Sequence, residues 1–85
     1  MYLHLGQSTV ITHDEIIGIF DLDNTTVSKN TRNYLNIAEK EHRVFPVSNE
    51  LPKSFIVCGK DSDIKVYLSQ ISCATLLKRA KESIY

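Results

Sequence analysis

The stretch Ile16–Lys29 reads IIGIFDLDNTTVSK and joins an apolar run to a polar turn and the start of a helix. Residues 16–22 are almost continuously apolar and rich in isoleucine and phenylalanine, a composition typical of a central strand that is covered on both faces. Ser28 is a good N-cap for the next element, a helix that we expect to end at about Glu41 or His42. The stretch therefore predicts a buried strand followed by a helix.

The same stretch contains Asp-x-Asp-x-Thr at Asp21, Asp23 and Thr25, a spacing that resembles the motif of haloacid dehalogenase-like phosphatases. In that chemistry the first aspartate attacks phosphorus, the second transfers a proton, and Mg²⁺ neutralises the phosphoryl charge. A distant lysine and a second acidic pair are also needed, and residues 60–63 could imitate them from a predicted turn. The required doubly wound sheet needs crossovers of about a dozen residues or more each, and 85 residues cannot supply enough of them. The sequence therefore argues against an enzyme.

Short strands alternate with turn signals along the rest of the chain. They are expected at residues 2–5, 9–12, 16–22, 43–47, 54–58 and 64–69, with helices after Ser28 and Ser72. Gly18 indicates a bend or a close backbone approach, and Pro46 favours an edge position or a bulge for its strand. The sequence predicts an α+β domain with a small, mainly antiparallel sheet of five or six short strands and two helices. Such a sheet leaves edges and uncovered faces, so we expect self-association.

Composition excludes several classes of protein. The 85 residues predict a single domain, residues 1–85, with an ordinary apolar content of 42%. No run approaches the roughly 20 apolar residues of a membrane span, and the N-terminus lacks a signal pattern. We therefore expect a cytoplasmic protein without membrane contact. The three histidines show no ligand spacing, so no metal or cofactor is expected.

The two cysteines, Cys58 and Cys73, are too far apart for a Cys-x-x-Cys motif. Cys58 ends an apolar run and is expected to behave as a small buried hydrophobe. Cys73 falls in the first turn of the last expected helix, where it is either a packed thiol or a reactive one whose pKa is lowered by the helix dipole.

Charge is distributed unevenly although the net charge is zero. Residues 1–28 carry four acidic side chains and no lysine or arginine, whereas residues 29–85 carry ten basic side chains against six acidic ones, a balance of +4. Such a chain either presents a basic face or simply carries mixed charge on its helix surfaces.

Four blocks of sequence together extend over essentially residues 1–80: MYLHLG, IIGIFDLDNTTVSK, LPKSFIV and VYLSQISCATLLKRA. In content, order and spacing they resemble the RemB branch of the RemA/RemB family of extracellular matrix regulators. The resemblance implies a bacterial, cytoplasmic, non-enzymatic protein. In the RemA branch the family binds DNA, activates biofilm matrix genes and assembles into rings, and the RemB branch is linked to the same programme. The implied partners are DNA, further copies in a ring-like homo-oligomer, and a RemA-like relative.

Candidate DNA-phosphate contacts fall into two groups of basic residues. The first comprises Lys53, Lys29 and Arg32, and the second comprises Lys78, Arg79 and Lys81. No helix-turn-helix, zinc finger or ribonucleoprotein motif is present, so sequence readout would depend on DNA shape or on repeated loops.

Two functions are compatible with these residues. The first is an oligomeric DNA-binding regulator of matrix genes, in which a few cations per subunit act multivalently. The second is an oligomeric accessory protein of the same pathway that does not contact DNA. The RemA branch has arginines in the loop that corresponds to residues 49–53, where only Lys53 is basic here, and a basic residue where this chain has Glu15. These departures favour the second function, but the family resemblance and the +4 balance after residue 28 make the first function our leading hypothesis.

Overall fold

A computed structural model describes residues 2–22, 29–60 and 62–82. Within this part of the chain it contains six strands, two α-helices and one short 3-10 helix. In chain order they are β1 (Tyr2–Gly6), β2 (Thr9–Thr12), η1 (His13–Glu15), β3 (Ile16–Asp21), α1 (Lys29–Lys40), β4 (Val44–Pro46), β5 (Ser54–Lys60), β6 (Asp63–Ser69) and α2 (Cys73–Glu82). The predicted α+β class, the two helices and the number of short strands are confirmed.

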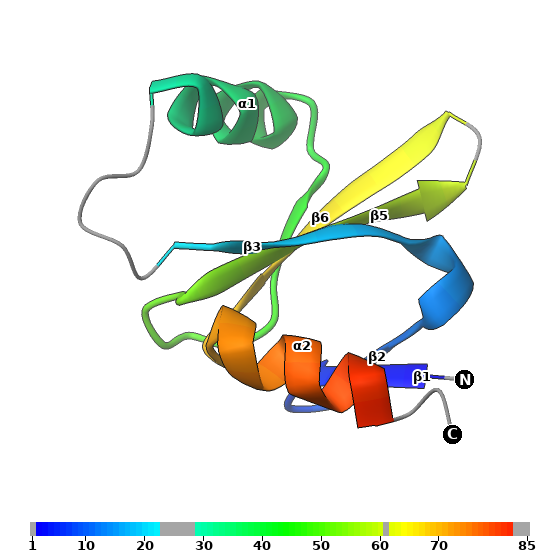
Figure 1. The fold of residues 1–85 in the computed structure, drawn as a ribbon. Coiled ribbons are helices and arrows are strands. Elements are labelled where there is room, and N and C mark those ends of the chain that lie inside the picture. The colour runs from blue at the N-terminus through cyan, green and yellow to red at the C-terminus, as the bar shows by residue number, and fades with distance from the viewer. Residues whose placement is uncertain (1, 23–28, 61, 83–85) are drawn as a thin grey trace.

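The described strands form two sheets (Figure 1). β1 and β2 make an antiparallel hairpin, and the other four strands form a sheet in the order β3-β5-β6-β4. Pairing in this main sheet is antiparallel except between β4 and β6, which run parallel. α1 lies on one side of the main sheet, whereas α2 and the β1–β2 hairpin lie on the other. β4 is an edge strand, so the edge position inferred from Pro46 is confirmed.

The prediction that residues 16–22 form a central strand is wrong. β3 is an edge strand, and two of its large side chains are exposed, Ile17 at 61% and Phe20 at 45%. The central position belongs to β5, which has β3 and β6 as neighbours and is buried from Ser54 to Cys58. Both strands are apolar runs, and only their pairing partners decide which of them lies inside the sheet.

Alternation along β5 divides the interior into two cores. The α2-side core consists of Leu3, Leu5, Ile11, Ile56, Cys58 and Leu76. The α1-side core consists of Ala38, Phe55, Val57 and Val66. The two helices therefore bury opposite faces of the same strand.

A register shift between Ile16 and Gly18 bends β3, as the glycine predicted. The shift lets Ile16 pack against the α2-side core while Ile17 lies with Phe20 on the α1 side. A Cβ atom at Gly18 would lie 2.6 Å from the ring of Phe20, so a larger residue there would displace that ring.

Two buried hydroxyl groups of the main sheet bond to the hairpin and to the connection between β6 and α2. Ser69 is fully buried, and its Oγ donates to the Leu5 carbonyl at 2.6 Å and accepts from the Ile71 amide at 3.1 Å. Its cross-strand partner Ser54, also fully buried, donates to the Ile71 carbonyl at 2.7 Å. These bonds fix the segment that connects β6 to α2.

Both helices have identifiable ends. Ser72 caps α2, because its Oγ accepts from the Thr75 amide at 3.2 Å, which confirms the predicted cap. At the end of α1, His42 is left-handed with φ 59° and the Arg43 amide donates to the Ala38 carbonyl at 2.9 Å, as in a Schellman motif. Ser28, the expected cap of α1, lies outside the described residues.

Candidate nucleic-acid interface

Lys53 stands on a backbone that is held from two sides. Its amide donates to the Ser69 carbonyl at 2.8 Å, and its carbonyl accepts from the Leu22 amide at 2.8 Å. The loop before it contains a local turn in which the Glu50 amide donates to Ser48 Oγ at 2.8 Å. Lys53 is therefore an exposed cation at a fixed position between the ends of β3 and β6.

Lys29 and Arg32 lie in the first turn of α1, and both are exposed. α1 begins at the end of the domain where β3 ends and β5 begins (Figure 1). Lys29, Arg32 and Lys53 thus share one end of the domain, here called the basic end. Asp21 and Glu50, at the end of β3 and in the loop before β5, place two carboxylates at the same end and leave a small excess of positive charge.

The second predicted group lies elsewhere. Lys78, Arg79 and Lys81 are exposed on the later turns of α2, on the opposite side of the main sheet from α1 (Figure 1). Arg79 is engaged within the fold, because its Nη1 donates to the His4 carbonyl at 3.4 Å. The structure therefore does not merge the two predicted groups into one surface.

Arg43, another basic side chain of the described residues, serves the fold. Its Nε and Nη2 lie 2.9 and 2.7 Å from Glu41 Oε1, and Nη1 lies 3.5 Å from the Ile64 carbonyl. Hydrogen bonding to Glu41, and secondly to Tyr34, raises the pKa of Arg43. This arginine links the end of α1 to β6, and its charge is already matched.

The cysteines are packed thiols. Burial, and secondly the charge of Glu15, raises the pKa of Cys58. Burial, and secondly the charge of Asp21, raises the pKa of Cys73, whose Sγ lies 3.8 Å from the Ile19 carbonyl. The hypothesis of a reactive Cys73 with a lowered pKa is wrong, because desolvation and a nearby carboxylate both oppose the thiolate.

The residues that a phosphatase would need are kept apart. Asp21 pairs with Ser54 at the start of β5, whereas Lys60 and Asp63 pair with each other at its far end. The six residue-to-residue steps from Ser54 to Lys60 along the extended strand correspond to roughly 20 Å. Asp23, Thr25 and Asp61 lie outside the described residues. Among residues 2–22, 29–60 and 62–82, no group of three or more histidine, cysteine, aspartate or glutamate side chains is placed to hold a metal ion.

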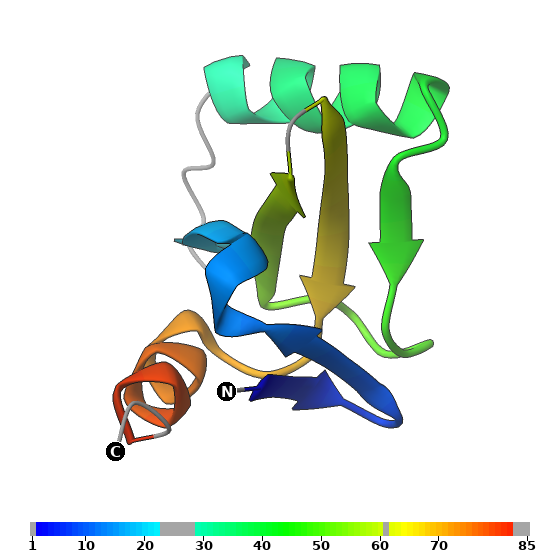
Figure 2. The same ribbon diagram turned by 90° about the vertical axis from the view of Figure 1, so that its right-hand side faces the viewer.

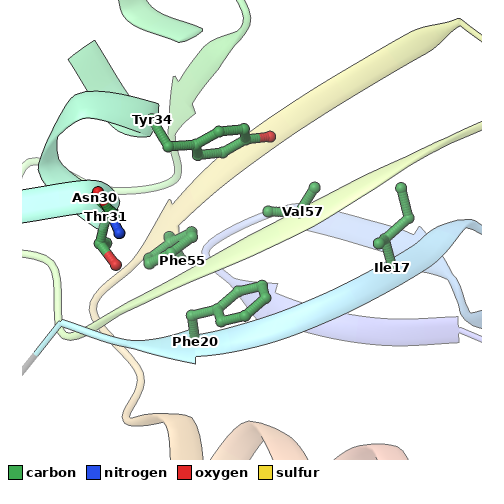
Figure 3. Close-up of a pocket in the computed structure, with 7 residues that line it drawn as sticks. All are labelled: Ile17, Phe20, Asn30, Thr31, Tyr34, Phe55 and Val57. Atoms are coloured by element: carbon green, nitrogen blue, oxygen red, sulfur yellow. The ribbon is translucent and has the colours of Figure 1, made fainter. Parts of the chain in front are cut away.

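An apolar groove that the sequence did not predict lies between α1 and β3 (Figure 3). This α1–β3 groove has a volume of about 350 Å³ and is lined by Ile17, Phe20, Asn30, Thr31, Tyr34, Phe55 and Val57. The rings of Phe20 and Phe55 are stacked with centroids 4.8 Å apart, and Tyr34 extends over the groove from α1. The edge position of β3, which leaves Ile17 and Phe20 exposed, creates the groove.

Comparison with known proteins gives one clear relationship. The chain is 36% identical over 81 residues to the extracellular matrix regulatory protein B of Bacillus subtilis (strain 168), and the match covers 95% of this chain and 91% of that protein. No family model matches the chain. Within the described residues, neither α-helix combines the length and apolar character required to cross a membrane.

Proposed function

The chain belongs to the family of extracellular matrix regulatory protein B, and from that premise we propose that it is a cytoplasmic, oligomeric, DNA-binding regulator of genes for the biofilm matrix. Its relative is named as a regulatory protein, and we assign this chain no catalytic step and no cofactor. The basic end carries the proposal: Lys29, Arg32 and Lys53 are exposed, and hydrogen bonds on both sides fix the backbone of Lys53.

Phosphate contacts supply most of the sequence-independent affinity for DNA, and each engaged cation adds about 0.9 to the slope of log affinity against log salt. Three cations on one subunit, opposed by nearby Asp21 and Glu50, give only weak binding. Repetition of the basic end in an oligomer raises the effective concentration of cations along a duplex, so avidity replaces single-site affinity.

The test is an anisotropy titration of a labelled duplex at several low salt concentrations. We expect the double variant Lys29→Glu with Lys53→Glu to bind far more weakly and to lower the salt slope by about 2. The matched control is Lys60→Glu with Lys65→Glu, which makes the same charge change on exposed side chains at the far end of β5. A wild-type protein that does not bind, or two double variants that bind equally, would contradict the proposal.

The second candidate function is an accessory protein that binds a RemA-like relative without contacting DNA. The two carboxylates at the basic end and the engagement of Arg43 with Glu41 favour it, because they leave few uncompensated cations. Co-purification with the relative, combined with a titration that shows no DNA binding, would support this function over the first.

A further inference from the structure

We propose that the free edge of β3 in one copy of this chain pairs with the free edge of β4 in a second copy, so that the main sheet continues from subunit to subunit. The sheet order leaves these two strands at its margins (Figure 2). In the figure they lie on opposite sides of the sheet, with α1 above and the hairpin below. Unpaired strand edges are templates for pairing with another chain.

The backbone of β3 is oriented for such a contact. The Leu22 amide donates to the Lys53 carbonyl across the ladder with β5. Phe20 and Gly18, every second residue before Leu22, therefore also turn their backbone N–H and C=O groups toward β5. Ile19 alternates with these residues along the strand and turns its backbone N–H toward the open margin. Its carbonyl lies 3.8 Å from the thiol of Cys73, which is a weak hydrogen-bond donor.

Exposed apolar side chains flank this margin on both faces. Ile17 and Phe20 are 61% and 45% exposed on the α1 side, where they form the outer wall of the α1–β3 groove. On the α2 side, Leu77 is 52% exposed. It lies one helical turn after Cys73, on the side of α2 that is turned toward Ile19. A strand added beside β3 would cover apolar surface above and below the sheet.

β4 has the direction and the side chains to be that strand. β3 and β6 are both antiparallel to β5, and β4 is parallel to β6, so β3 and β4 run in the same direction. A lateral repeat of the subunit therefore brings them together as a parallel pair, with α1 of every copy on the same face. Phe45, which is 41% exposed and packs on Tyr67, would then lie on the α2 side near Leu77 of the neighbour.

The hydrogen bonds of β4 leave acceptors free on its outer side. The Arg43 carbonyl accepts from Val66, and the Val47 amide donates to Leu68, so these residues and Phe45 face β6. Val44 and Pro46 alternate with these residues, so their backbone groups point away from β6. Pro46 has no N–H, which weakens pairing between two β4 edges, but its carbonyl can still accept from a β3 edge.

The distribution of charge also favours the pairing of a β3 edge with a β4 edge over the pairing of two β3 edges. Residues 2–22 contain no lysine or arginine, and Asp14 and Glu15 directly precede β3. Two β3 edges would therefore bring like charges together without compensation. The segment just before β4 carries Lys40 and Arg43 against Glu39 and Glu41, so the parallel pair places the acidic residues of one copy beside a segment of balanced charge instead of beside like charge.

This contact rests on the proposed function for its role, because it repeats the basic end along one array. A contact between two different patches joins subunits head to tail, and the array closes only if the rotation between subunits permits it.

The experiment measures mass by light scattering and sedimentation, without DNA, on the wild type, Ile17→Lys and Phe45→Lys. Both substitutions change exposed side chains, and circular dichroism and thermal unfolding of each variant verify that the fold is intact. Leu77→Lys is a second variant of the β3 margin that leaves the strand itself unchanged.

We expect the wild type to form species larger than a dimer and each single variant to be monomeric. An equimolar mixture of Ile17→Lys and Phe45→Lys should form a dimer, because each variant retains the edge that the other has lost. A monomeric wild type, a Phe45→Lys variant of unchanged mass, or a mixture that stays monomeric would overturn the proposal. Since the masses are read without DNA, failure of this contact is distinguishable from failure of DNA binding.

Discussion

Replacement of Ser69 by alanine tests the buried hydroxyl that joins β1 to the main sheet. Ser69 is fully buried, donates to the Leu5 carbonyl at 2.6 Å and accepts from the Ile71 amide at 3.1 Å. Leu5 lies at the register shift between His4 and Gly6, so it has no partner residue on β2. The substitution would leave the buried Leu5 carbonyl and the part-buried Ile71 amide without this partner.

The magnitude follows from these two groups. Each buried polar group left without a hydrogen bond costs about 1–3 kcal/mol. Allowing for partial relaxation, we expect Ser69→Ala to lower the free energy of unfolding by about 2–4 kcal/mol, a large fraction of the stability of a domain of this size. With a urea m-value near the lower end of the usual range, about 1 kcal/mol/M, the unfolding midpoint would fall by about 2–4 M.

Urea unfolding and amide hydrogen exchange of Ile71 are the two measurements. Ser48→Ala is the matched control, because Ser48 Oγ accepts from the Glu50 amide at 2.8 Å in an exposed loop. We expect its effect to be within about 0.5 kcal/mol. The reasoning is refuted if Ser69→Ala is as mild as the control, or if the Ile71 amide exchanges no faster in the variant than in the wild type.

Further outcomes follow from the burial of single side chains. Phe55→Ala, in the central strand with 4% exposure, should lower the free energy of unfolding by about 3–5 kcal/mol, whereas Phe20→Ala at the 45% exposed edge should lower it by about 1–2 kcal/mol. Chemical unfolding at low protein concentration measures both values, and the reverse order would contradict the strand order. Ser72→Ala should cost about 1 kcal/mol through loss of the α2 cap, and a thermal unfolding midpoint identical to that of the wild type would disprove the cap. Because burial raises the pKa of Cys58 and Cys73 in the folded state, unfolding releases protons above the ordinary thiol pKa of about 8.5, so stability should fall as pH rises through that value. Rapid alkylation of native Cys73 at neutral pH would argue against this shift.

Features that depend on near neighbours in the chain could be predicted from the sequence. Ser72 caps its helix, Pro46 marks an edge strand, and Gly18 lies at a bend, because caps, missing amides and glycine conformations act within a few residues. The α+β class followed from the order of the short predicted strands and helices.

Long-range pairing decided the rest. The apolar run of β3 and the apolar run of β5 are alike as sequences, yet β5 gained two neighbours and β3 only one. That difference turned Ile17 and Phe20 from expected core residues into an exposed margin with a groove beside it. The tertiary structure also places α1 and α2 on opposite sides of the sheet, which separates the two groups of basic residues. The physical reason is that periodicity reports which face of a strand is apolar, whereas its place in the sheet depends on partners more than 30 residues away.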